Sequence, residues 1–89
     1  MAQSYPNPFT EGGTTIEFDM PVTEKISMVI LDIRGRVVRK LIDNEQRFGF
    51  QSIIWDAKND DGDNVSSGVY FYQIRSDNFN AVGKLVFVK

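Results

Sequence analysis

Residues 56–63 form an acidic loop and are the first stretch of this chain that could do chemistry. The loop holds four of the twelve acidic residues, namely Asp56, Asp60, Asp61 and Asp63. Loops rich in carboxylate and amide oxygens can bind calcium. The candidate ligands are Asp56, Asn59, Asp61 and Asp63. The EF-hand spacing is absent, because Gly62 would place Ala57 at the first ligand position and Gly68 at the last. We therefore expect a turn-rich loop without a metal, with calcium binding as the alternative.

A basic cluster follows one predicted turn and raises the question of nucleic-acid binding. Its members are Arg34, Arg36, Arg39 and Lys40. Proteins that read nucleic acids are usually basic overall and place aromatic rings between the charges. This chain has a net charge of −2, and only aliphatic residues separate these cations. The cluster therefore predicts a solvated strand edge, and no nucleic-acid partner is expected.

Catalytic constellations are hard to build from this composition. The 89 residues include neither cysteine nor histidine, so thiolate nucleophiles, the common zinc sites and Ser/His/Asp triads are excluded. A pair of carboxylates could hydrolyse glycosides, but so short a chain has little room for a deep cleft. We expect a domain that is not an enzyme and needs no cofactor.

Period-2 alternation of apolar residues runs through most of the chain and predicts β-strands. Ile16, Phe18 and Met20 share one face, and Pro21 is expected to end that strand. Gly35 suits a tight turn, and residues 43–49 read as a polar loop. The predicted strands are residues 14–20, 25–31, 36–42, 50–55, 68–75 and 79–89. Together with a proline-rich N-terminal segment, they indicate an all-β, immunoglobulin-like antiparallel β-sandwich of about seven strands.

The segment Tyr5-Pro6-Asn7-Pro8-Phe9 cannot be helical, because each proline fixes φ and pushes the preceding residue toward extended geometry. We expect Tyr5 and Phe9 to cap one end of the sandwich. The prolines would keep that edge from pairing with another chain.

Gly68 and Tyr70 match the tyrosine corner of immunoglobulin-like folds, in which a tyrosine hydroxyl reaches the backbone at a bend between sheets. This interpretation needs no binding role for either residue. A more distant hypothesis is a carbohydrate-binding surface made of Trp55, Phe71 and Tyr72, although Trp55 is expected to face the core.

Taken in order, these stretches resemble a known family. They are "YPNPF", "TTIEFDMP", "ISMVILDIRGRVVRKL", "GFQSIIWDAKNDDGDNVSSGVYFYQI" and the final "KLVFVK". The set resembles the C-terminal sorting domain of cargo proteins of the bacterial type IX secretion system. It is also similar to the immunoglobulin-like domain of flagellar hook-capping proteins.

The resemblance implies a non-catalytic targeting module that directs a larger secreted cargo protein to the cell surface. It implies protein partners in the secretion machinery at the outer membrane and a cargo domain N-terminal to this one in the same chain. The location implied is secreted or cell-surface, reached through the periplasm and outer membrane of a Gram-negative bacterium. The positions that match the family's motifs are Pro6, Asn7, Pro8, Gly68, Tyr70, Lys84 and Lys89.

Two domain-level expectations complete this interpretation. Residues 1–4 are expected to be a flexible N-terminus or residues added for expression, and residues 5–89 the sorting domain itself. No apolar run is long enough to span a membrane, and a monomer is expected.

The alternative function is a structural immunoglobulin-like spacer, or an assembly module of a bacterial surface or hook-cap-type protein.

Overall fold

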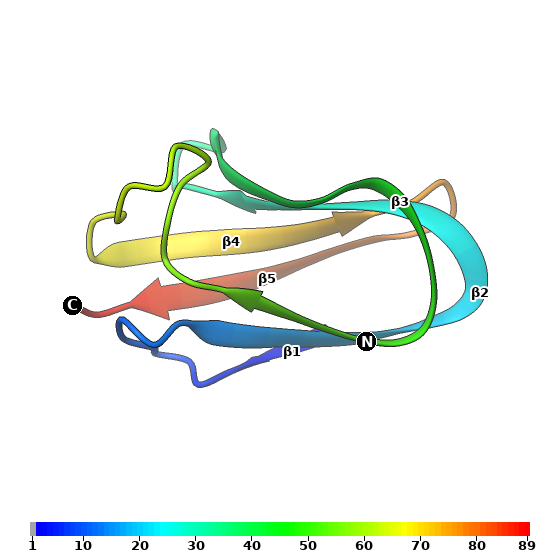
Figure 1. Ribbon diagram of the computed structural model, residues 1–89, viewed down its shortest axis with the longest axis horizontal. Helices are drawn as coiled ribbons and strands as arrows, with labels where there is room; N and C mark the ends of the chain where they lie inside the picture. Colours follow the sequence, from blue (N-terminus) through cyan, green and yellow to red (C-terminus); the bar gives the residue numbers. More distant parts are fainter. Residues whose placement is uncertain (1) are drawn as a thin grey trace.

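The computed structural model describes residues 2–89, which form five antiparallel β-strands. The strands are β1 (Ala2–Tyr5), β2 (Thr14–Leu31), β3 (Val37–Trp55), β4 (Gly68–Arg75) and β5 (Asn80–Phe87). They form one sheet in the order β1-β2-β4-β5, with β3 also paired to β2 (Figure 1). The prediction of an all-β, antiparallel fold is confirmed. Residues 2–89 contain no helix with the length and apolar character that crossing a membrane requires.

The long strands β2 and β3 bend and carry the sheet around on itself, so that it curls into a half-barrel (Figure 1). The start of β2 pairs with β1 and with the end of β3, whereas the end of β2 pairs with β4 and with the start of β3. We call residues 2–5, 14–20 and 49–55 the first layer. We call residues 27–31, 37–42, β4 and β5 the second layer. One apolar core lies between the two layers.

The predicted count of about seven strands is wrong, because two predicted breaks lie inside strands. Pro21 belongs to β2, and residues 43–49 belong to β3. The pairing register shifts between Met20 and Glu24, and at such an irregularity a proline costs no ladder hydrogen bond. Asn44 and Gly49 adopt positive φ inside β3. Gly49 still pairs with Met20, whereas Asn44 lies at a shift in the register and donates its N–H to the Ser27 hydroxyl at 3.0 Å. Each long strand therefore contains two of the predicted segments.

The core consists of the faces that alternation predicted. Along β2, Ile16, Phe18 and Met20 are buried, and further along the same strand so is Met28. Trp55 is fully buried, with its indole N–H donating to the Lys58 carbonyl at 2.9 Å. Buried residues from the later strands are Tyr70, Tyr72, Ile74, Leu85 and Phe87. The face that Ile16, Phe18 and Met20 share is therefore the inward one, because successive side chains of a strand point to opposite faces.

The N-terminal segment differs in part from expectation. Residues 2–4 pair with β2 as part of β1, where a flexible N-terminus was predicted over residues 1–4; Met1 lies outside the described residues. Phe9 is buried as expected, but Tyr5 remains half exposed and is not an apolar plug. Its hydroxyl instead donates to Glu17 at 2.8 Å, and this bond, with the carboxylate's charge and some burial, raises the pKa of Tyr5.

The turn between β2 and β3 has the predicted glycine geometry. Gly35 has φ +82° and donates its N–H to the Asp32 carbonyl at 3.0 Å. The Asp32 carboxylate accepts the backbone N–H groups of Arg36 and Arg34 and the Arg36 side chain. These interactions, led by the Arg36 backbone bond, lower the pKa of Asp32. The carboxylate thus helps to define the turn.

Tyr70 forms the predicted tyrosine corner. Its hydroxyl donates to the Ser66 carbonyl at 2.6 Å, and its ring lies edge-on to Trp55 at a centroid distance of 5.3 Å. Burial, with a smaller effect of the Asp32 charge, raises the pKa of Tyr70, which keeps the hydroxyl protonated as a donor.

Changing Tyr70 to Phe should remove this hydrogen bond and little else. We expect the free energy of unfolding to fall by about 1 kcal/mol. Thermal unfolding followed by circular dichroism measures the effect. Tyr5→Phe is the matched control, since it removes an exposed hydroxyl and should change stability by less than about 0.5 kcal/mol. Equal effects of the two variants would show that the corner does not stabilise the fold.

Candidate recognition site at the last strand

The proline segment, residues 6–9, lies along the free edge of β5. Phe9 donates its N–H to the Val86 carbonyl at 2.9 Å, and Val88 donates to the Phe9 carbonyl at 2.8 Å. Phe9 and Phe87 thereby form a parallel bridge. The start of the described chain and its last strand are held together by backbone hydrogen bonds.

The side chain of Asn7 makes the hydrogen bonds that a neighbouring strand would otherwise make to this edge of β5. Its Nδ2 donates to the Lys84 carbonyl at 2.8 Å, and its Oδ1 accepts the Val86 N–H at 2.9 Å. A primary amide carries a donor and an acceptor in one plane, as a peptide group does. Asn7 therefore satisfies two main-chain groups of β5 that would otherwise be free to pair with another strand.

Packing beneath the proline segment locks it in place. The Phe9 ring lies 5.1 Å from that of Phe87 and 5.6 Å from that of Trp55, measured between centroids. Thr14, which is 1% exposed, donates its hydroxyl to the Pro6 carbonyl at 2.8 Å. The rings of Pro6 and Pro8 remain exposed. The segment is thus anchored through Phe9 and presents its prolines outward.

The opposite edge of β5 pairs with β4, which contains two more of the predicted site residues. Gly68 is the partner of Phe87, and Tyr70 is the partner of Leu85. Beyond the strand, the Lys89 N–H donates to the Ser67 hydroxyl at 3.0 Å. The structure therefore brings Asn7, Gly68, Lys84 and Lys89 together around one strand. The Tyr70 side chain faces the core and is not part of the exposed surface.

Exposed side chains on this strand alternate with buried ones. Lys84 is exposed and lies beside Phe71 on the neighbouring strand, while Val82 is 59% exposed. Leu85 and Phe87 point inward. The arrangement offers a strand with defined main-chain geometry and a row of outward side chains, which suits recognition by a protein surface.

Sequence reasoning missed the residues that build the edge. Asn7, Lys84 and Lys89 were singled out by their motifs, but Val86 and Ser67, which complete the contacts of Asn7 and Lys89, were not. Phe9 was expected to be buried, yet nothing in the sequence indicated that its backbone would bridge to Phe87. The alternation in residues 84–88 was the available signal, but it indicates only which side chains share a face of the strand and not what lies along its edge.

Of the four candidate calcium ligands, Asn59 and Asp56 use their side chains to hold the loop. The Asn59 Oδ1 accepts the N–H groups of Asp61 and Asp63, both at 3.0 Å. Asp56 contacts the Arg39 guanidinium and the Lys58 N–H, each at 3.2 Å. Within residues 2–89, no three acidic side chains are grouped closely enough to hold a metal ion.

Two of the three rings proposed for sugar binding lie in the core. Trp55 is 0% exposed and Tyr72 is 5% exposed, so neither offers a face to a sugar. The basic cluster is partly neutralised, because Arg36 pairs with Asp32 and Arg39 with Asp56. Neither cluster forms a site comparable to the edge of β5.

Comparison with known proteins gives relatives of two kinds. The basal-body rod modification protein FlgD of Salmonella typhimurium, and that of Salmonella typhi, are each 38% identical over 63 residues, which cover 71% of this chain and 27% of the relative. The chain thus spans about a quarter of the length of these curated relatives.

A solved structure of PorZ, described as an essential bacterial surface component of the type-IX secretion system of Porphyromonas gingivalis, shares the fold. The TM-score is 0.69 and the identity 22%, over 99% of this chain and 11% of the PorZ chain. The family described as the secretion system C-terminal sorting domain matches residues 3–89. Because this match covers nearly the whole chain, the protein belongs to the secretion system C-terminal sorting domain family.

Proposed function

We propose that this domain is a non-catalytic address that directs a larger cargo protein through the type IX secretion system to the cell surface. Its partners would be secretion-machinery proteins at the outer membrane, and its cargo would precede it in the same chain. Family membership supports the sorting role. The location that follows is secreted or cell-surface, after passage through the periplasm and outer membrane.

The observation that carries this proposal is that the N-terminal proline motif is hydrogen-bonded to the last strand, β5. Asn7 hydrogen-bonds the backbone of both Lys84 and Val86, so the proline motif and the last strand form one continuous surface. A receptor could read the exposed prolines together with Lys84 and Lys89. Gly68 would contribute by its position beside Phe87, and Tyr70 by supporting the strand from within.

We also infer that the curled sheet is a variant of the immunoglobulin-like sandwich. The tyrosine corner and the likeness in fold to PorZ support this inference. The two layers would correspond to the two sheets of the sandwich, with β2 and β3 each contributing to both.

A reporter fusion tests the sorting function directly. Residues 3–89 are attached after a reporter that carries its own secretory signal, and the fusion is expressed in a type IX-competent host. We expect the reporter to reach the medium or cell surface, and the same reporter without the domain to stay in the periplasm. If the full fusion also stays in the periplasm, the sorting proposal is wrong.

That negative result would favour the alternative, a structural or assembly module, which rests on the 38% identity to FlgD. A module of that kind would fold and be stable without changing where the reporter goes. Measuring the folded fraction of the retained fusion by protease resistance separates this case from simple misfolding.

A further inference from the structure

Charge is divided between the two layers of the domain. The second-layer strands contain four cations, Arg39, Lys40, Arg75 and Lys84, and no acidic residue. The first-layer strands contain two acids, Glu17 and Asp19, and no cation. The strands of the second layer therefore carry a local excess of positive charge in a domain with a net charge of −2, and such an excess attracts an anionic partner.

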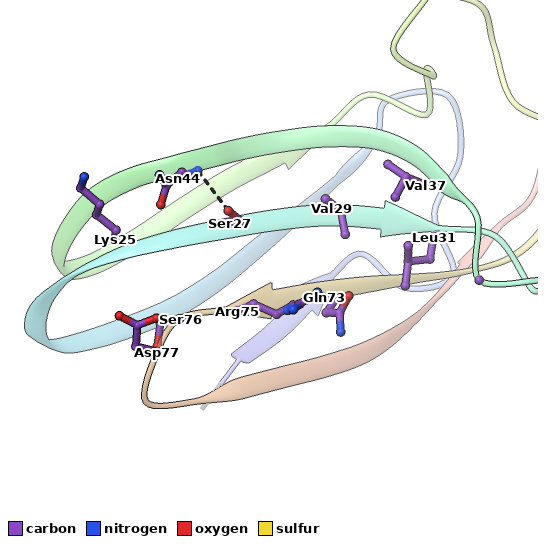
Figure 2. A pocket seen from close by; sticks show the side chains of 11 residues that line it. Lys25, Ser27, Val29, Leu31, Val37, Asn44, Gln73, Arg75, Ser76 and Asp77 are labelled. Carbon is purple, nitrogen blue, oxygen red and sulfur yellow. Dashed lines mark hydrogen bonds between the residues drawn. The ribbon is translucent and has the colours of Figure 1, made fainter.

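A groove of about 590 Å³ is hollowed into the outer side of the second layer (Figure 2). Its floor includes the apolar Val29 and Leu31 of β2 and Val37 of β3, together with the polar Ser27 of β2 and Gln73 of β4. Lys25 and Arg75 lie at its rim, from β2 and β4, and Asp77 follows in the turn after β4. The groove thus combines a mixed floor with two cations and one acid, Asp77, around it.

Of the four second-layer cations, Arg39 pairs with Asp56, and the other three form no ion pair with the residues that the structure describes. The ion pairs formed within residues 2–89 use Arg36, Arg39 and Arg47. Lys25 and Arg75, like Lys84 further along the same face, are exposed and outside these pairs. Their charges are therefore available to a ligand, and an exposed cation that meets a carboxylate at an interface contributes to specificity and association rate.

We propose that this groove docks an extended acidic segment of a partner protein, with apolar side chains on the floor and carboxylates at Lys25 and Arg75. The inference rests on the proposed sorting function and describes a second contact surface, away from the edge of β5. A protein segment fits better than a lipid surface, because membrane binding needs apolar side chains that protrude. Here Val29 and Leu31 are only partly exposed, Val37 is the one floor valine that is half exposed, and Asp77 would repel a dense anionic surface.

A direct binding test uses a labelled peptide of alternating glutamate and valine, followed by fluorescence anisotropy at low and moderate salt. We expect binding that weakens with salt, and an increase of about tenfold in Kd for Arg75→Glu. Arg34→Glu is the matched control, because Arg34 is an exposed cation outside the groove, in the β2–β3 turn. It should leave Kd unchanged. A lysine–valine peptide should not bind.

Absence of binding to the acidic peptide, or equal effects of Arg75→Glu and Arg34→Glu, would overturn the proposal. If Arg75→Glu unfolds the domain, Lys25→Glu takes its place. A separate experiment uses vesicles of phosphatidylglycerol. If the domain binds these vesicles and Arg75→Glu abolishes that binding, the groove binds lipid and not an acidic protein segment. The reporter fusion separates the two proposals. If the unaltered domain exports the reporter and the Arg75→Glu domain exports it equally well, the docking surface is rejected and the sorting function still stands.

Discussion

Replacing Phe9 by Ala should lower the free energy of unfolding by about 3–5 kcal/mol, the range for truncating a fully buried aromatic ring. Phe9 is 1% exposed and packs against both Trp55 and Phe87. Small domains are stable by only about 5–15 kcal/mol, so this loss should leave a substantial unfolded fraction near physiological temperature. Urea denaturation followed by Trp55 fluorescence measures it.

The matched control is Phe48→Ala, because Phe48 is 66% exposed on β3. Truncating it should change stability by less than about 0.5 kcal/mol. The Phe9 substitution should also release the proline segment, so that amide hydrogens of Val86 and Val88 exchange faster than in the unaltered protein. Equal stabilities of the two phenylalanine variants would show that Phe9 is not part of the core.

Gly83→Ala should destabilise the domain by about 1–3 kcal/mol, although it adds a single methyl group. Gly83 pairs with Tyr72 across β4 and β5, and the Tyr72 ring lies over the glycine where a Cβ atom would stand. Tyr72 is 5% exposed, so its ring cannot move aside without disturbing the core. Equilibrium unfolding in urea measures the effect.

A double-mutant cycle identifies the cause. Combined with Tyr72→Leu, the Gly83→Ala change should cost less than it does alone, with a coupling of at least about 0.5 kcal/mol. Gly12→Ala is the control, because no atom other than those of Gly12 and its two chain neighbours lies within 4 Å of the added methyl group. Additive effects of the Gly83 and Tyr72 changes would rule out a direct clash between them.

The inward faces and the local turns of this protein could be predicted from its sequence. Alternation put Ile16, Phe18 and Met20 on one face, which is the buried one, and Gly35 was expected at a tight turn, where it has positive φ. The spacing of Gly68 and Tyr70 predicted the tyrosine corner. These features depend on neighbouring residues along the chain, and the backbone's period of two is a local property.

Only the tertiary structure decided where the strands are continuous and which residues contact β5. Pro21 did not end its strand, since the irregularity in pairing beside it removes the need for a backbone donor. Asn7 found partners on β5 at separations of 77 and 79 residues, and Gly83 received the Tyr72 ring. Contacts of this kind depend on which strands become neighbours. Local periodicity cannot specify that choice, because it is made by the packing of the whole core.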